Sequence, residues 1–150
     1  MEKKEKEPAK KCVKLVSACL AGINCRFDGG NCANPKVLKI VGSGNVAVAC
    51  PELLAGFSVP RERMELRGGR VFTESGKDVT EQLRRGAEQF LAAAKKLGVK
   101  KAILKARSPS CGKGKIYDGS FSGKLVDGDG IVALLLMENG INVLTEDDIE

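Results

Sequence analysis

The sequence contains no histidine and no tryptophan, and it has only one tyrosine. The absence of histidine excludes Ser–His–Asp triads, imidazole general bases and zinc sites with histidine ligands. Any acid–base chemistry must therefore use carboxylates, Lys, Tyr, Cys or bound water. Because aromatic residues are so few, the core of the protein must be built from aliphatic side chains.

Long hydrophobic runs are also absent. The longest, Ile131 to Met137, covers about two helical turns, whereas a membrane-spanning helix needs roughly 20 apolar residues. The first eleven residues, MEKKEKEPAKK, carry five Lys and three Glu and lack the hydrophobic segment of a signal peptide. We therefore expect residues 1–11 to form a disordered charged tail, no contact with a membrane, and a cytoplasmic location.

The net charge of +6 would suit an anionic partner such as nucleic acid. Part of this excess lies in the charged tail, however, and the remainder is not interleaved with aromatic residues in a basic band. The composition therefore disfavours a nucleic-acid surface, although an RNA- or nucleotide-binding domain stays open as an alternative. It does not define an oligomeric state.

The order of the expected elements indicates an α/β fold. Strands and helices alternate along a chain of 150 residues, which is the length of one domain with a substantial core. We predict a single three-layer, Rossmann-like domain over residues 12–150, with a mostly parallel sheet. The predicted strands are residues 13–17, 45–49, 101–105 and 141–144, and the predicted helices include 35–40 and 130–139.

Polar residues at predicted helix ends suggest specific caps. Asp78 and Glu81 resemble a capping box at the start of a long helix that ends at Gly98. Asp129 is placed to cap the helix 130–139.

Two further segments have distinctive patterns. ELRGGRVFTESG is typical of a β-hairpin turning at Gly68-Gly69. Residues 106–128 resemble one long loop, and such loops in a compact domain are often functional.

Three cysteines follow predicted strands. Cys19 comes after KLVSA, Cys50 after NVAVA, and Cys111 after KAILKA and the loop SPSC. Because the carboxyl ends of parallel strands converge on one crevice, these distant thiols are expected to meet there. In a reducing compartment, six cysteines favour metal binding or catalysis over disulfides. Three thiolates leave the coordination of a metal or cluster incomplete, as a catalytic centre requires.

Several neighbours of these cysteines have chemistry of their own. Cys50 lies at an expected helix start, which would lower the pKa of its thiol, and Glu52 follows two residues later. Ser108 and Ser110 place two hydroxyls close to Cys111. Each feature also has a purely structural interpretation, because Glu52 could simply complement the helix dipole and a Ser-Pro-Ser turn is common in loops.

The number of thiolates distinguishes the metals that this chain could hold. A [4Fe–4S] core on three thiolates keeps one iron open. A zinc site would recruit Cys25 as a fourth ligand and become a closed structural centre. A redox dithiol is disfavoured because the sequence contains no CxxC. The spacing alone leaves cluster and zinc open.

Taken together, SACLAGINCRFDGG, CPELLAG with a following PR, and KARSPSCG with a following DGSFSG resemble the thiouracil desulfidase family. The resemblance covers roughly residues 14–147. It implies an α/β domain that carries a [4Fe–4S] cluster on Cys19, Cys50 and Cys111, with Cys25 as an alternative ligand or a neighbouring thiol.

Other residues stand outside this resemblance or depart from it. Cys12 and Cys32 lie outside the motifs and are interpreted as incidental. Phe27 occupies a position where the family often has Tyr, so that a hydroxyl near the site is missing.

The resemblance also implies a reaction, the non-redox desulfuration of a small thiolated pyrimidine such as thiouracil, which releases hydrosulfide and uracil. Glu52 is the expected general acid/base, and Ser108 or Ser110 would hold the ring or relay a proton. Besides the RNA- or nucleotide-binding domain, two alternatives remain. One is a structural zinc or iron–sulfur module, and the other is a desulfidase or sulfur-transfer enzyme for a thiolated nucleoside or tRNA base.

Overall fold

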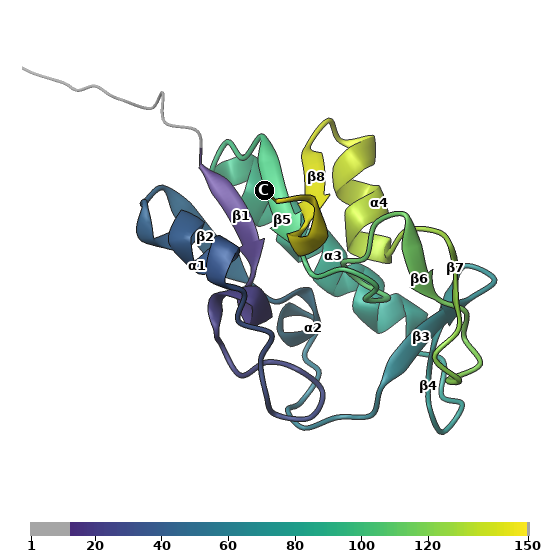
Figure 1. Ribbon diagram of the computed structural model, residues 1–150. Coiled ribbons are helices and arrows are strands. Elements are labelled where there is room, and N and C mark those ends of the chain that lie inside the picture. The colour runs from purple at the N-terminus through teal and green to yellow at the C-terminus, as the bar shows by residue number, and fades with distance from the viewer. Residues whose placement is uncertain (1–12, 150) are drawn as a thin grey trace, which may run out of the picture.

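A four-stranded parallel sheet forms the centre of the computed structural model, which describes residues 13–149 (Figure 1). The expected tail 1–11 and Cys12 lie outside the described residues. The strand order is β2-β1-β5-β8, and every neighbouring pair is parallel. The strands are β1 (Lys14–Ser17), β2 (Val46–Ala49), β5 (Lys101–Leu104) and β8 (Asn142–Thr145).

Helices cover both faces of this sheet, as the three-layer prediction requires. Alternate residues of a strand face opposite sides, so Leu15 packs with α3 (Thr80–Lys96) and α4 (Ile131–Glu138), whereas Val16 packs with α1 (Pro35–Gly42). Phe90 is the one aromatic residue in the larger cluster, and its other buried members are aliphatic or small. No helix among residues 13–149 is long and apolar enough to cross a membrane.

The register of the sheet brings the ends of three strands to one edge. Ser17 pairs with Ala49, and Val16 pairs with Ile103. The strands β1, β2 and β5 therefore end side by side at the same edge of the sheet. The chain continues into the 3₁₀ turn η2 (Ala18–Ala21) after β1 and into the short helix α2 (Pro51–Leu54) after β2.

The predicted cap of the long helix is wrong. Asp78 does accept the backbone N–H of Thr80, but it also pairs with Arg70, and Glu81 pairs with Arg84 instead of completing a capping box. The charged partners on the neighbouring strand and on the next helical turn outcompete the reciprocal cap.

The predicted cap of α4 is also wrong. Asp129 accepts the backbone N–H of Gly114 instead. The first N–H groups of α4 are satisfied by the loop before it, because Ile131 donates to the carbonyl of Pro109 and Val132 to that of Ser110. The helix is thereby fastened directly to the SPSC loop.

Two antiparallel hairpins stand at one end of the sheet (Figure 1). The predicted hairpin is confirmed as β3 (Met64–Arg67) and β4 (Arg70–Thr73), with both turn glycines at positive φ. The expected loop 106–128 is only partly a loop, because it contains the hairpin of β6 (Lys115–Tyr117) and β7 (Leu125–Asp127). Strands of three residues are too short to show an alternating pattern.

Candidate active site

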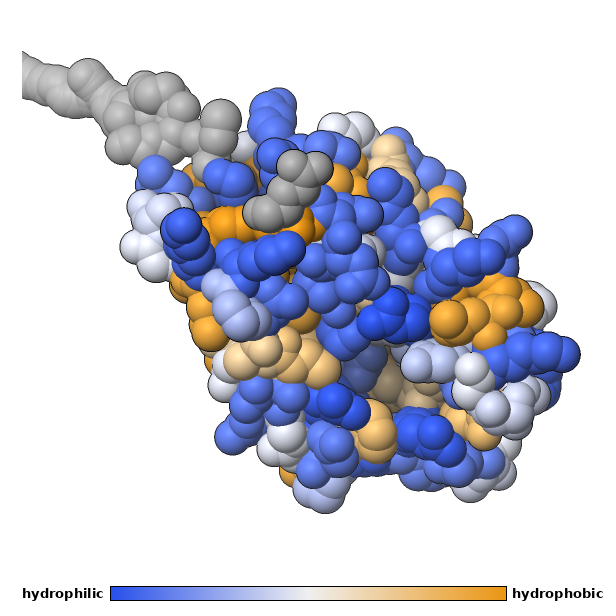
Figure 2. Space-filling view, in the orientation of Figure 1, coloured by the Kyte–Doolittle hydropathy of each residue, from blue (hydrophilic) through white to orange (hydrophobic). Residues whose placement is uncertain are grey.

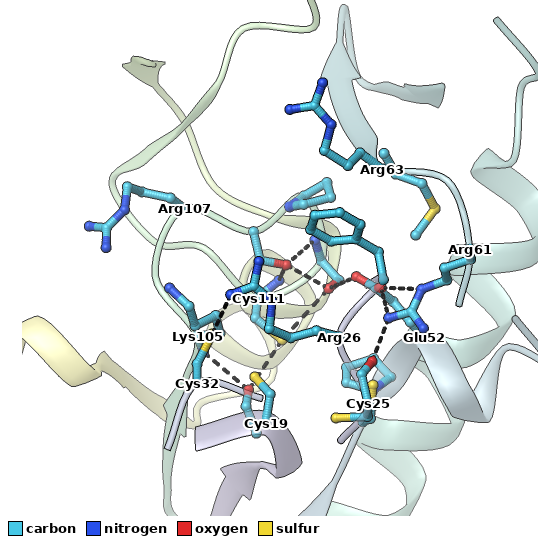
Figure 3. Close-up of a pocket in the computed structure, with 18 of the residues that line it drawn as sticks. Cys19, Cys25, Arg26, Cys32, Glu52, Arg61, Arg63, Lys105, Arg107 and Cys111 are labelled. Atoms are coloured by element: carbon cyan, nitrogen blue, oxygen red, sulfur yellow. Dashed lines mark hydrogen bonds and ion pairs between the residues drawn. The ribbon is translucent and has the colours of Figure 1, made fainter. Parts of the chain in front are cut away.

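A cavity of about 440 Å³ opens between the carboxyl ends of β1, β2 and β5 and the two hairpins. Figure 2 shows this hollow with mostly hydrophilic residues around its mouth, and Figure 3 shows the side chains that line it. The structure thus brings together cysteines that are widely separated in sequence. The thiols on its walls are Cys19, Cys25, Cys32, Cys50 and Cys111.

The first cysteine loop leaves β1 through η2 and turns back at Gly22, whose φ is +90°. The carbonyl of Cys19 accepts the N–H groups of Gly22 and Cys32, which folds the loop onto itself. Cys32, interpreted from sequence as incidental, lies on the cavity wall, and its sulfur accepts a hydrogen bond from Arg26 at 3.3 Å.

Cys25 lies against both Cys19 and Cys50. Its hydrogen bond with Cys19 is the main reason that its pKa is raised to about 11, and the contact with Cys50 acts in the opposite direction. The expectation of a lowered pKa for Cys50 is wrong: the contact with Cys25, together with burial, raises it. The four-residue helix that follows Cys50 is too short to outweigh these effects.

Cys111 is buried, with 3% of its surface exposed. Burial raises its pKa to about 12, although the hydroxyl of Ser17 donates to its sulfur. The hydroxyl of Ser108 accepts the N–H groups of Ser110 and Cys111, which fixes the loop. The loop packs so tightly on α4 that a Cβ at Gly130 would lie 2.5 Å from the carbonyl of Ser110.

Glu52 joins two of the predicted motifs. Its Oε1 accepts hydrogen bonds from Arg61, and its Oε2 accepts one from Ser110 Oγ at 3.0 Å. Ser110 Oγ lies in turn 2.9 Å from Ser108 Oγ. The three residues predicted as catalytic, Glu52, Ser110 and Ser108, therefore form one continuous hydrogen-bonded chain. Figure 3 shows Glu52 at one end of this chain, with its bonds to Arg61.

Arg61 is the residue that ties this chain to the first cysteine loop. Its side chain is 7% exposed, and besides Glu52 it donates to the backbone carbonyls of Cys25 and Ser58. A buried ion pair is tolerated when further hydrogen bonds satisfy its charged groups, and the two carbonyls do this for Arg61.

Close packing of α2 against α3 fixes the positions of Cys50 and Glu52 in the wall of the cavity. The short helix α2 rests on α3 at Gly86, where an added Cβ would lie 2.6 Å from the Cβ of Ala55 and would also clash with the carbonyl of Pro51. A glycine inside a helical pattern is the sequence signal for such an approach.

The opposite wall comes from the hairpins and includes Glu65, which no sequence motif singled out. Glu65 is 5% exposed, and its Oε1 accepts the N–H groups of Gly119 and Phe121, each at 3.0 Å. The ring of Phe121 lies 5.7 Å from the guanidinium of Arg63. The sequence carries no signal for it, because in MELR Glu65 alternates with Met64 and Leu66 as a solvent-facing strand residue would.

The potential metal ligands in this cavity are mainly thiols, the ligands that iron–sulfur clusters take. Among residues 13–149, no three His, Cys, Asp or Glu side chains converge closely enough to hold one metal ion. A zinc site that uses Cys25 as fourth ligand is thus not preformed. A [4Fe–4S] cluster is several Å across, takes thiolates, and so fits cysteines spread over the walls of one cavity.

An α/β domain whose strand ends present thiols to one crevice defines a class of protein, the Rossmann-like enzymes with a cysteine-bound metal centre. Within that class the family is established by comparison with known proteins. Residues 15–148 match the 2-thiouracil desulfurase family, and the chain belongs to this family.

Two relatives cover nearly the whole chain. The uncharacterized protein YbbK of Bacillus subtilis (strain 168) is 46% identical over 145 residues, which are 90% of this chain and 96% of YbbK. The solved structure of the [4Fe-4S]-dependent thiouracil desulfidase TudS superposes with a TM-score of 0.87 at 40% identity, over 91% of this chain and 92% of TudS. The family and the α/β fold expected from the sequence are both confirmed.

Proposed function

We propose that this protein is a [4Fe–4S]-dependent desulfidase that removes sulfur from a small thiolated pyrimidine such as 2-thiouracil, releasing hydrosulfide and uracil. The observation that carries this proposal is the meeting of thiols from three strand ends with the Glu52–Ser110–Ser108 chain in one cavity. Membership of the 2-thiouracil desulfurase family and the likeness to TudS support it.

Cys19, Cys50 and Cys111 would hold the cluster, since each follows a different strand of the sheet. When bound, the cluster supplies an iron with an open coordination position, a thiophilic Lewis acid suited to the sulfur of the substrate. Cys25 then remains a neighbouring thiol.

Glu52 is proposed as the general acid/base. Arg61 holds Oε1, so Oε2 is the atom that can take a proton from Ser110 Oγ. Ser108 Oγ lies 2.9 Å from Ser110 Oγ and would extend this path by one hydroxyl to the attacking water. General acid–base catalysis requires such contacts at hydrogen-bond distance.

The bonds balance as a hydrolysis. The water oxygen forms a bond to the ring carbon that bears sulfur, and its proton passes along the hydroxyls to Glu52. The C–S bond breaks, and its electron pair leaves with the sulfur, which takes the second proton of the water and departs as hydrosulfide. Glu52 then releases the first proton. Substrate and water become uracil and hydrogen sulfide, with no electron donor or acceptor consumed.

The charged residues at the cavity mouth favour a free base over a phosphate-bearing substrate. Lys105 pairs with Glu146 at 2.9 Å, and Arg107 pairs with Asp147 at 2.8 Å. These cations are already neutralised by partners on the protein, so they offer little to a phosphate group.

Replacement of Glu52 tests the proposed role. Glu52→Gln keeps the shape of the side chain but cannot take up the proton, so we expect hydrosulfide release from 2-thiouracil to fall by about a hundredfold with unchanged iron content. Glu88→Gln on the exposed side of α3 is the matched control. A Glu52→Gln protein with a full cluster and full turnover would remove Glu52 from this role.

A further inference from the structure

One oxygen of the buried carboxylate of Glu65 has no hydrogen-bond partner among residues 13–149. Glu65 is 5% exposed and lines the cavity. Its Oε1 accepts two backbone N–H groups, from Gly119 and Phe121. Its Oε2 makes no hydrogen bond or ion pair with any residue in the part of the chain that the structure describes. A buried carboxylate oxygen without a donor is costly, and buried polar atoms are nearly always satisfied.

The alternation along β3 shows which way this side chain faces. Met64 and Leu66 pack into a hydrophobic cluster that includes Val71 and Leu83. Because successive side chains of a strand point to opposite sides, Glu65 faces away from that cluster. It faces the segment 118–123, which carries its two N–H donors and borders the cavity through Gly123.

The surroundings hold this carboxylate in place. Gly119 lies so close to β3 that an added Cβ would be 2.6 Å from the Cβ of Arg67, and the ring of Phe121 packs on the guanidinium of Arg63. With Oε1 fixed by two donors from this segment, Oε2 is the oxygen left to meet a ligand in the cavity.

We propose that Glu65 is a specificity-determining residue whose Oε2 accepts a hydrogen bond from a ring N–H of the thiolated pyrimidine. This inference rests on the proposed function. A free thiouracil carries an N–H on each side of its C=S group, and a carboxylate is an acceptor suited to such a donor. The contact would hold the ring while its sulfur faces the cysteines on the opposite wall.

The proposal predicts which pyrimidines are rejected. A substrate that carries a methyl group or a sugar on the recognised nitrogen has lost its donor and leaves Oε2 buried and unpaired. Sites built to bind a polar group reject analogues that lack it far more strongly than apolar pockets reject a missing methylene. Free bases are therefore preferred over derivatives substituted at that nitrogen.

Glu65→Gln separates substrate binding from a merely structural role. The amide oxygen of Gln can still accept from Gly119 and Phe121, so the segment 118–123 keeps its anchor, but an NH₂ donor replaces Oε2. Glu62→Gln is the matched control, because Glu62 also lines the cavity. Both of its carboxylate oxygens already accept hydrogen bonds, from the N–H and the hydroxyl of Ser75.

The experiment measures kcat and KM of the cluster-loaded proteins with 2-thiouracil, 1-methyl-2-thiouracil and 3-methyl-2-thiouracil. In the wild type, one methylated substrate should have a KM raised by about tenfold or more, the loss expected for a hydrogen bond to a charged group. Glu65→Gln should raise the KM for 2-thiouracil by a similar factor, leave kcat within about threefold, and show no further penalty for that methylated substrate. Glu62→Gln should behave as the wild type.

Unchanged KM values in Glu65→Gln would overturn the inference, and so would a wild type that accepts both methylated substrates as well as 2-thiouracil. Neither result would contradict the proposed desulfidase function. The second of these results needs no variant and so does not depend on folding of Glu65→Gln. A fully loaded wild type that releases hydrosulfide from none of the three substrates would instead overturn the proposed function, and the inference with it.

Discussion

The two walls of the cavity are built on different principles. One wall is the carboxyl edge of the parallel sheet, where Cys19, Cys50 and Cys111 follow three strands. The other consists of two short hairpins, which contribute Arg63 and Glu65. The first wall carries the thiols and the Glu52 chain, and the second carries none of the cysteines.

This difference suggests a division of work between the walls. The topology of the sheet brings the thiols and the hydrogen-bonded chain of Glu52, Ser110 and Ser108 to the same edge. The hairpin wall depends on specific polar contacts, above all the two N–H groups that Glu65 receives from a segment more than fifty residues away. We therefore expect damage to the sheet edge to remove the cluster or lower kcat, and damage to the hairpin wall to raise KM.

The largest effect is expected for Cys111→Ser. A serine hydroxyl is a poor ligand for iron in a cluster, whereas its size suits the buried position. Iron content and hydrosulfide release should both fall to background, as iron and labile-sulfide analysis would show. Cys32→Ser should retain its iron, and retention of about four irons by Cys111→Ser would contradict the proposed ligand set.

Gly86→Ala should disturb the sheet edge through the contact between α3 and α2. The added Cβ meets Ala55 and the carbonyl of Pro51, so α2 must shift and carry Glu52 away from Ser110. Overpacking of this kind costs about 1–3 kcal/mol, which chemical denaturation would measure, and kcat should fall more than KM rises.

Gly42→Ala is the control for this change, because its added Cβ meets no atom within 4 Å apart from its chain neighbours and the backbone of its own helix. Equal stability of the two alanine variants would show that the close approach of α2 to α3 is not required.

Gly119→Ala tests the hairpin wall with a change of the same size. Its Cβ would crowd Arg67 and the carbonyl of Leu66, at a φ of +93° that favours glycine. We expect an unchanged iron content and a KM for 2-thiouracil raised by roughly three- to tenfold, because the anchor of Glu65 moves. Gly69→Ala has similar backbone strain without crowding and should leave KM unchanged. Loss of iron in Gly119→Ala would contradict the expectation that damage to the hairpin wall raises KM and leaves the cluster in place.

The smallest effect is expected for Cys25→Ser. If three cysteines hold the cluster, this variant keeps its iron and loses less than about fivefold in turnover. Cys25 also raises the pKa of Cys50, and a protonated thiol must lose its proton to bind iron, so loading weakens as pH falls. Cluster reconstitution of Cys25→Ser at a series of pH values should therefore extend to lower pH than in the wild type. Loss of the cluster would make Cys25 a ligand.

The sheet edge could be predicted from sequence because its signals are local. Buried parallel strands appear as short apolar runs, and the rule for their carboxyl ends then brings Cys19, Cys50 and Cys111 together. Glu52, Ser108 and Ser110 followed from their spacing to these cysteines. The structure places all six residues on one cavity.

The hairpin wall could not be predicted because its determinants are distant in sequence. Glu65 looks like a solvent-facing residue of a hairpin strand, and its burial depends on Gly119 and Phe121. The strands β6 and β7 have three residues each, too few for a periodic signal.

The incorrect caps have a similar cause. Asp78 and Asp129 satisfy local rules for helix starts, but Arg70 and the N–H of Gly114 compete for their carboxylates in the folded chain. Local capping signals do not include such tertiary partners. The pKa of Cys50 was likewise mispredicted, because its neighbour Cys25 approaches only in the folded protein.

The central claim is that the sheet edge holds a cluster with one open iron and uses it for desulfuration. Its most direct test is anaerobic reconstitution followed by iron and sulfide analysis and by an assay of 2-thiouracil turnover on the same sample. We predict about four irons and four labile sulfides per chain, with uracil and hydrosulfide formed in equal amounts. One zinc per chain, or a complete cluster that releases no hydrosulfide from any thiolated pyrimidine, would contradict the claim.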